Sequence, residues 1–391
     1  MTGVQTCALP ISPAARLTNF YLAAALGGWI GGALVSLGAP FLFPALYEYP
    51  VIVLLLAPAF WWCREKPLTR LRTGISYAAV VGRSVVVAFL VLLIVKEGWQ
   101  TLQEPVRFRH RNFYGTYTIW DVASYPQDIR QLLHGRTIHG AQLLDPETRM
   151  TPIMYYFIGG GIADVYETAP PGRRMAVLGL GAGAAASYVK PGETMVYYEI
   201  DPDNEGIARH WFSFLNECRG RVRVVVGDGR LGLQNSDRLE PPYDIIHMDA
   251  FTGDGIPTHL LTREAVRVYL ERLSGNGVIL FHVSNRYYEL RPVIKAIAAE
   301  LGLAGAVNVP TPKTELKANQ SATWCVVLAR NPDRLAALVR KGWIPFGPGD
   351  GLREVTPWTD DYINILLPLR DGMRERWDGF NFAQWLKTLR P

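Results

Sequence analysis

The chain has 391 residues, of which 49% are hydrophobic and 19% charged, and its formal net charge at pH 7 is +5. This length exceeds one ordinary domain, and the hydrophobic fraction is high for a protein wholly surrounded by water. The basic residues are spread along the chain, so nucleic acid is not expected as a partner. The four cysteines are widely spaced without a CxxC pair and imply neither a disulfide framework nor a zinc site.

The N-terminal part of the chain is predicted to hold a leader followed by membrane helices. Residues 1–12 resemble a translated sequencing-adapter fragment, and we interpret them as an artefactual or disordered leader. Residues 13–98 are predicted to form a transmembrane helical region. Its first run, 19–43, contains no charged residue and is longer than the roughly 20 residues that a bilayer requires.

Two further apolar runs extend this region. The run 49–63 ends in an aromatic pair, and the run 75–95 holds Arg83 near its middle, where a charge must face protein, reach the interface or mark a break. The positive-inside rule places the basic loop 64–74 in the cytoplasm. We expect a multi-pass protein of the cell (inner) membrane. The alternative is a set of buried helices in a large globular domain.

Residues 99–165 are predicted to form a small β domain and a segment that caps a pocket. Alternating segments at 107–122, 129–135 and 136–145 are separated by turn residues, which is typical of a small antiparallel sheet. The apolar, glycine-interrupted segment 152–167 is expected to be the capping helix.

Residues 166–330 alternate apolar strand candidates with helical patterns, which indicates βαβ units around a mostly parallel sheet. Residues 331–391 are interpreted as a C-terminal extension. The predicted strands are 175–180, 194–200, 222–227, 243–249, 277–284 and 323–329. Ligands of such sheets bind beyond the carboxyl ends of the strands, so the informative residues are expected where strands stop.

The first of these strands runs into a glycine loop, GLGAG at 179–183. Gly179, Gly181 and Gly183 allow backbone N–H groups and the start of a following helix to approach a ligand closely. The spacing, with Ala184 in last place, tolerates a dinucleotide. A tight strand-to-helix turn without a ligand is the other interpretation.

Acidic residues end the next three strands. Glu199 is placed to bind both hydroxyls of a ribose. Asp228 can accept a hydrogen bond from an adenine amino group while Gly229 leaves room for the ring, and Asp249 lies at the pocket mouth. This set fits an S-adenosyl ligand better than a dinucleotide.

These residues resemble the spermidine synthases (polyamine aminopropyltransferases), in particular the membrane-fused branch of that family. The resemblance covers roughly 105–330, with a looser tail to about 370. It implies an α/β fold with an S-adenosylmethionine methyltransferase-like (Rossmann-like) sheet after the small β unit. It also implies a transferase of polyamine biosynthesis that moves an aminopropyl group from decarboxylated S-adenosylmethionine to a small-molecule amine. That donor is a co-substrate, no permanently bound cofactor is implied, and a homodimer is a further expectation.

The resemblance also assigns roles to single residues. Gln142, in the HGAQ stretch, would contact the sulfur end of the donor. Glu199 would bind the ribose, and Asp228 with Gly229 would contact the adenine. Asp249 would accept a proton from the attacking amine, because an ammonium has no lone pair and must be deprotonated before it displaces the carbon of the sulfonium.

The acceptor side departs from the pattern of the family. Ala182 stands where the glycine loop of the family ends in an aspartate, Thr252 replaces a second aspartate, and the Tyr-His-Glu element appears as Tyr155, Tyr156 and Phe157. The acceptor amine is therefore left open. The residues considered for substrate contact are Tyr156, Asp254, Asp360 and Asp361, of which the last two alternatively cap a helix N-terminus.

Two other functions stay open, an S-adenosylmethionine-dependent methyltransferase and a non-catalytic adenosyl-binding domain fused to a membrane region. The donor is a cytosolic metabolite, so the catalytic domain is expected in the cytoplasm. Three complete membrane crossings would instead place it outside the cytoplasm. Either the third apolar run is not a single crossing, or the count of helices is incomplete. No metal is expected. The histidines without metal-ligand spacing, which we interpret as core or strand-end residues, are His134, His139, His247 and His282.

Overall fold

The computed structural model describes residues 17–54, 85–89, 91–92, 96, 106–123, 127–135, 137–251, 255, 257–285, 287–312 and 315–369. The chain separates into two compact units, Met1–Thr118 and Ile119–Pro391. The finer five-part division expected from the sequence stays a prediction.

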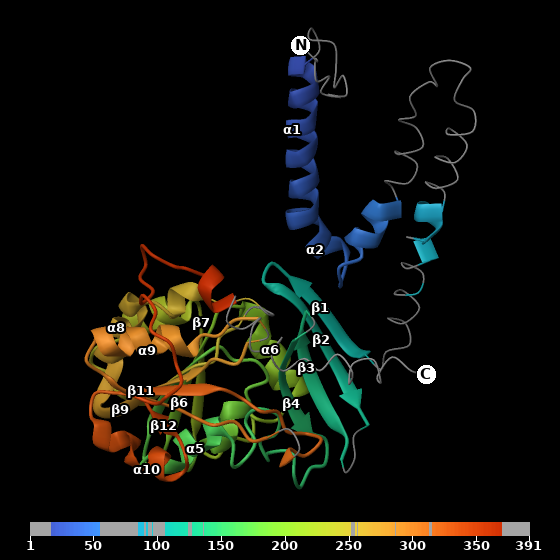
Figure 1. Ribbon diagram of the computed structural model, residues 1–391. Helices are drawn as coiled ribbons and strands as arrows, with labels where there is room; N and C mark the ends of the chain where they lie inside the picture. Colours follow the sequence, from blue (N-terminus) through green and yellow to red (C-terminus); the bar gives the residue numbers. More distant parts are fainter. Residues whose placement is uncertain are drawn as a thin grey trace, which may run out of the picture. The chain divides into compact units, whose positions relative to one another are not determined.

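The N-terminal unit begins with a long apolar helix. α1 (Leu17–Ala33) continues through the π-helical stretch η2 (Leu34–Gly38) into α2 (Ala39–Leu42) (Figure 1). Alanine and leucine, which favour helix, are frequent in it, and no side chain of α1 is buried. By length and composition this helix is able to cross a membrane, and it coincides with the predicted span 19–43.

The two further membrane runs are described only in part. Residues 48–54 are helical, whereas most of the runs 49–63 and 75–95, Arg83 included, lie outside the described residues. Within the described ranges, one helix meets the length and composition of a membrane span. Multi-pass topology is therefore not supported by the structure and stays a proposal.

The predicted small sheet is present. It has four strands in the order β1-β2-β3-β4, namely β1 (Val106–Asn112), β2 (Gly115–Val122), β3 (Ile129–His134) and β4 (Thr137–Leu143). β3 and β4 pair antiparallel with a register shift after Leu132. The middle of β4 contacts the glycine loop described below.

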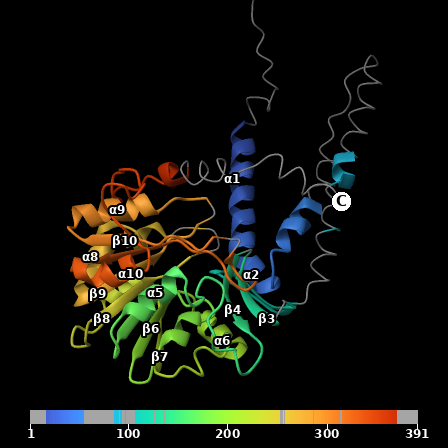
Figure 2. The same cartoon turned by 60° about the horizontal axis from the view of Figure 1, so that its bottom comes forward.

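The large sheet has eight strands in the order β12-β10-β11-β9-β8-β5-β6-β7, and Figure 2 shows β9, β8, β6 and β7 following one another across it. The strands are β5 (Arg174–Leu178), β6 (Thr194–Glu199), β7 (Arg221–Val226), β8 (Tyr243–Met248), β9 (Leu273–His282), β10 (Ala304–Val307), β11 (Cys325–Ala329) and β12 (Ile344–Pro345). β5 to β9 are mutually parallel, whereas β11 is antiparallel to both β9 and β10, and β12 is antiparallel to β10. Six strands of this sheet therefore run in one direction and two in the other.

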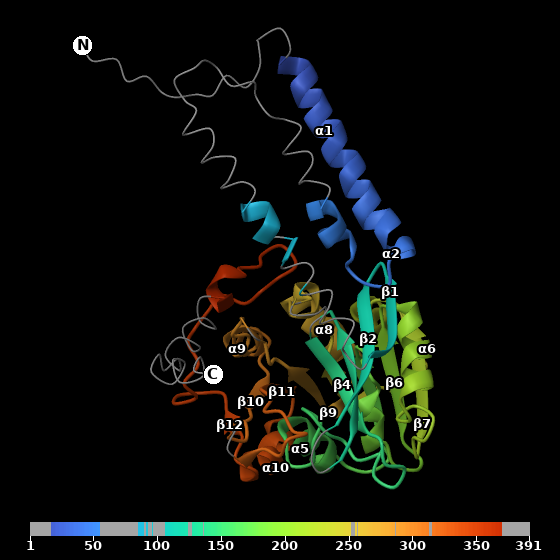
Figure 3. The same ribbon diagram turned by 90° about the vertical axis from the view of Figure 1, so that its right-hand side faces the viewer.

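Helices cover both faces of the large sheet, with α8 and α9 on one side and α5 and α10 on the other (Figures 1 and 3). The α-helices are α5 (Gly161–Thr168), α6 (Pro202–Trp211), α7 (Gly229–Gln234), α8 (Arg263–Arg272), α9 (Arg291–Glu300) and α10 (Ala336–Arg340). Strand side chains alternate between the faces. Leu178 and Ile279 thus join Tyr269 of α8 and Ile294 of α9 in one core. The predicted fold class, a mostly parallel Rossmann-like sheet after a small antiparallel one, is confirmed.

Three local expectations were wrong. The strands β10 and β12 were not predicted, because four and two residues are too short to show a periodicity. The segment 152–167 was predicted to be one helix, but its first part, 152–160, is irregular. Only α5 is helical, and it begins at the last of the three glycines 159–161. The small residues after the glycine loop form η3 (Ala184–Tyr188), a short 3₁₀ helix, so no long helix dipole points into the site.

Candidate active site

The carboxyl ends of β5, β6 and β8 are joined by backbone hydrogen bonds around Gly179. The Gly179 N–H donates to the carbonyl of Tyr198 at 2.8 Å, and the Asp249 N–H donates to that of Leu178 at 2.9 Å. Gly179 has a φ of +96°, and a Cβ there would lie against the carbonyl oxygen of Asp249. Glycine is therefore required where the end of β8 approaches this turn.

The rest of the glycine loop packs against the middle of β4, at His139 and Gly140. Gly181 and Gly183 have φ values of +52° and +80°. The Ala182 N–H donates to the carbonyl of His139 at 3.3 Å, and a Cβ on Gly140 would lie 2.5 Å from the Cβ of Ala182. Ala182 is fully buried in this contact, so its small side chain matches the space that β4 leaves.

Glu199 lies at the end of β6 with its carboxylate turned into the protein. It accepts hydrogen bonds from the Leu180 N–H at 2.9 Å, the Asp201 N–H at 2.9 Å and the Asn204 side-chain amide at 3.0 Å. Burial raises the pKa of Glu199 against the opposing effect of these donors. A carboxylate has about four acceptor positions, so one stays free for a ribose hydroxyl, and a second becomes free if Asn204 moves away.

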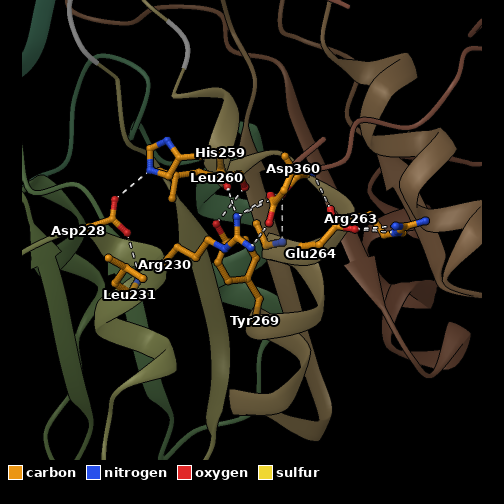
Figure 4. A network of polar contacts seen from close by, with 11 residues as sticks. Asp228, Arg230, Leu231, His259, Leu260, Arg263, Glu264, Tyr269 and Asp360 are labelled. Atoms are coloured by element: carbon orange, nitrogen blue, oxygen red, sulfur yellow. Dashed lines mark hydrogen bonds and ion pairs between the residues drawn. The ribbon is translucent and has the colours of Figure 1, made fainter. Parts of the chain in front are cut away.

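Asp228, at the end of β7, caps the N-terminus of α7. Its Oδ1 accepts from the Leu231 N–H at 2.9 Å, and its Oδ2 lies 2.9 Å from Nε2 of His259 (Figure 4). A Cβ on Gly229 would lie 2.8 Å from Cγ of Leu178. Gly229 is thus explained by close packing on β5, and its predicted contact with adenine stays a prediction.

The predicted substrate residue Asp360 is engaged elsewhere. Its carboxylate forms a bidentate pair with Arg230 at 2.8 and 2.7 Å and accepts from the Thr262 hydroxyl at 2.8 Å (Figure 4). Its N–H donates to Glu264 at 3.0 Å. Asp360 therefore ties the C-terminal segment to α7 and α8, and neither it nor the exposed Asp361 caps a helix, because both lie in a tight turn.

Asp249 forms the centre of a buried polar cluster, with a side chain that is 9% exposed. Its Oδ2 accepts a hydrogen bond from the Tyr156 hydroxyl, and its Oδ1 lies 2.6 Å from Nδ1 of His282. Burial alone would raise the pKa of Asp249, but His282, His247 and Tyr156 outweigh it and hold that pKa below its usual value. Burial raises the pKa of the Tyr156 phenol far above its usual value, so the hydroxyl stays a donor.

His282 was not predicted to take part in the site. It closes β9, and the register that pairs Met248 with Phe281 puts His282 beside Asp249. The rings of Tyr155 and Phe251 pack on its imidazole with centroid distances of 4.9 and 5.2 Å. The sequence did carry a signal, because this histidine lies two residues before the end of the predicted strand 277–284, near the edge that carries the carboxylates.

His247 lies on β8, two residues before Asp249, and is a core histidine as expected. It is completely buried, and its Nδ1 lies 3.1 Å from the Tyr166 hydroxyl. Burial lowers the pKa of His247 to about 4. The imidazole is therefore neutral at physiological pH.

Gln142 uses both ends of its amide within the fold. Its Nε2 donates to the carbonyl of Arg149 at 3.1 Å, and its Oε1 accepts from the Ser213 N–H at 3.1 Å. The predicted contact with the sulfur end of the donor stays a prediction. Asp254 and Thr252 lie outside the described residues.

Known proteins resemble the chain in sequence and in structure. No protein-family model matches it. The polyamine aminopropyltransferase of Vibrio vulnificus (strain CMCP6) is 27% identical over 203 residues, which cover 50% of this chain and 65% of that protein. The eEF1A lysine and N-terminal methyltransferase of Xenopus laevis is 28% identical over 125 residues, which cover 29% of this chain and 18% of that protein. The chain thus spans less than two thirds of either relative.

Two solved structures are spermidine synthases. The probable spermidine synthase from Corynebacterium glutamicum ATCC 13032 superposes with a TM-score of 0.47 and 17% identity, covering 64% of this chain and 97% of that one. The enzyme from Thermotoga maritima gives a TM-score of 0.44 and 12% identity, covering 68% and 84%. The sequence match agrees with the resemblance inferred from the strand ends, and the chain is similar to the polyamine aminopropyltransferases.

Proposed function

We propose that this protein transfers an aminopropyl group from decarboxylated S-adenosylmethionine to an amine. The observation that carries the proposal is the buried Asp249 carboxylate, held by Tyr156 and His282 at the end of β8. The glycine loop and Glu199 lie at the neighbouring strand ends, where ligands of such sheets bind. The sequence similarity to a polyamine aminopropyltransferase supports the same activity.

The chemistry requires few groups. The acceptor nitrogen loses a proton, its lone pair attacks the aminopropyl carbon next to sulfur, and the carbon–sulfur bond breaks with its electrons passing to sulfur. The leaving thioether is neutral and needs no acid. A negative charge beside the acceptor nitrogen favours the proton transfer, and such general-base assistance contributes about 10²- to 10⁴-fold.

The test is product formation by the full chain in detergent with either donor. With decarboxylated S-adenosylmethionine and a panel of mono-, di- and triamines, we expect release of 5′-methylthioadenosine. With intact S-adenosylmethionine we expect weaker binding by calorimetry and no methyl transfer. Tighter binding of intact S-adenosylmethionine would contradict the proposal, and binding of either donor without turnover would favour a non-catalytic adenosyl-binding domain.

The proposal includes a place for the enzyme in the cell. The apolar helix Leu17–Leu42 supports membrane attachment, and the cytosolic origin of the donor supports a cytoplasmic catalytic unit. We propose that the region 13–98 crosses the inner membrane several times and that the protein forms a homodimer. Reporter fusions after residues 46, 68 and 100 would establish the topology, and the mass of the detergent-solubilised protein its oligomeric state.

A further inference from the structure

Both carboxylate oxygens of Asp249 have a hydrogen-bond partner, Tyr156 or His282. One oxygen accepts from the Tyr156 hydroxyl and the other faces Nδ1 of His282 at 2.6 Å. Burial would raise the pKa of this carboxyl, but His282 and the Tyr156 phenol outweigh it, so the carboxylate is ionised. Because both of its oxygens already have a partner, another atom of the cluster is better placed to remove a proton.

The hydrogen bond to Asp249 fixes the tautomer of His282. A carboxylate without a proton can only accept, so Nδ1 of His282 must carry the hydrogen. In the neutral form of the imidazole, the lone pair then lies on Nε2. This nitrogen is buried and has no hydrogen-bond partner among the residues that the structure describes. A buried polar atom left without a partner costs free energy and calls for an explanation.

A second histidine whose Nε2 is buried and unpartnered among the described residues, His247, does not offer the same arrangement. His247 meets the hydroxyl of Tyr166, which both donates and accepts and therefore does not fix a tautomer. Among the described residues no carboxylate is hydrogen-bonded to the His247 ring, whereas Asp249 contacts His282 directly. The rings of Tyr155 and Phe251 give His282 a largely apolar surrounding that strengthens this pairing.

We propose that Nε2 of His282 is the atom that takes the proton from the acceptor nitrogen, and that Asp249 is a positioning residue that orients and stabilises the imidazole. This inference rests on the proposed aminopropyl transfer. The N–H bond of the acceptor ammonium breaks, its proton moves to Nε2, and the freed lone pair forms the new carbon–nitrogen bond while the carbon–sulfur bond breaks. Tyr156 holds the second oxygen of Asp249. Because Nε2 is buried, the entering amine must displace the atoms that cover it.

His282→Asn is the sharpest variant, because its side-chain amide can still donate to Asp249 from the place of Nδ1 but offers no basic nitrogen. We expect turnover of the full chain to fall about 10²- to 10⁴-fold, with 5′-methylthioadenosine affinity nearly unchanged. Asp249→Asn should lower turnover similarly, and the double variant should lose little more, because the two residues act as one unit. His210→Gln, at an exposed histidine outside the site, is the matched control and should keep full turnover.

A second readout does not depend on turnover. Long-range ¹H–¹⁵N spectra of histidine-labelled protein, with the His282 signals assigned from His282→Asn, report which ring nitrogen carries the hydrogen. We expect the Nδ1–H form in the parent protein and a mixture of tautomers in Asp249→Asn. A hydrogen on Nε2 in the neutral ring of the parent protein would overturn the inference.

Two different results would show whether the role of His282 or the proposed aminopropyl transfer is wrong. High turnover in His282→Asn, together with a large loss in Asp249→Asn, would overturn the inference and leave the aminopropyl transfer intact, with Asp249 as the base. A parent protein that binds the donor but forms no product with any amine would overturn the proposed function, and the role of His282 with it.

Discussion

Asp360 and Arg230, 130 positions apart in the chain, form a bidentate ion pair with N–O distances of 2.8 and 2.7 Å. Arg230 follows Asp228 by two residues, so this pair connects the C-terminal segment with the start of α7. The Asp360 side chain is 43% exposed, which limits what the pair contributes to stability.

Asp360→Asn is therefore expected to act on stability and not on catalysis. The free energy of unfolding should fall by about 0.5–1 kcal/mol, as for other solvent-exposed ion pairs, while turnover stays near that of the parent protein. A large rise in the KM for the amine in Asp360→Asn, without loss of stability, would restore a substrate role for Asp360.

Gly179→Ala should disrupt the site more than an ordinary loop substitution. The new Cβ meets the carbonyl oxygen of Asp249 at a φ of +96°, so the strand ends must separate. We expect a loss of unfolding free energy of roughly 3 kcal/mol or more, together with loss of donor binding. Gly192→Ala is the matched control, because its φ is +84° but no atom lies within 4 Å of the new Cβ. Backbone strain alone should cost it about 1–2 kcal/mol, and equal losses in both variants would argue against the clash.

Glu199→Gln tests the ribose assignment. The amide keeps the shape of the side chain but loses the charge and one of the two oxygens that now accept from Leu180, Asp201 and Asn204. Hydrogen bonds to charged groups contribute about 1.5–3 kcal/mol, so 5′-methylthioadenosine should bind about 10- to 100-fold more weakly. Calorimetric titration measures this. Glu205→Gln, which removes a surface pair on α6, should bind normally, and unchanged affinity in Glu199→Gln would refute the assignment.

The buried His247 should make the folded state sensitive to acid. Its pKa is about 4 in the folded protein and 6.5 in an unfolded chain, because burial disfavours the charged ring. Below pH 6.5 the unfolded chain binds a proton that the folded protein does not, so the unfolding free energy falls as the pH drops from 6.5 to 4. The loss contributed by this group is about 3 kcal/mol across that window.

Denaturant unfolding of the parent protein and of His247→Gln at pH 7.5, 6 and 5 checks this expectation. The variant should be less stable at pH 7.5, because it repacks a buried position, but its stability should fall less steeply toward acid. His210→Gln changes an exposed histidine and should keep the slope of the parent protein. Parallel slopes for parent and His247→Gln would show that His247 does not titrate in this window.

Local patterns were sufficient for the architecture. The strands β5 to β9 and β11 show as apolar runs separated by turn residues, and parallel order followed from their alternation with helices. The positions of Gly179, Glu199, Asp228 and Asp249 at strand ends were likewise readable from the sequence, because a strand end is a local property. Even so, the sequence did not predict that η3 would be a short 3₁₀ helix or that α5 would begin only at Gly161. Both depend on how Gly183 and Gly161 pack against neighbouring elements.

Contacts between side chains that are distant in the chain could be seen only in the tertiary structure. The sequence did not indicate that His282 would meet Asp249, that Arg230 would bind Asp360, or that both ends of the Gln142 amide would be used inside the fold. Each depends on the register of paired strands or on the docking of a loop, and a shift of one residue would turn the side chain to the opposite face. The sequence by itself therefore determined which strand ends carry acidic and glycine residues, whereas the pairing of side chains, including the contact between Asp249 and His282, arose only from long-range packing.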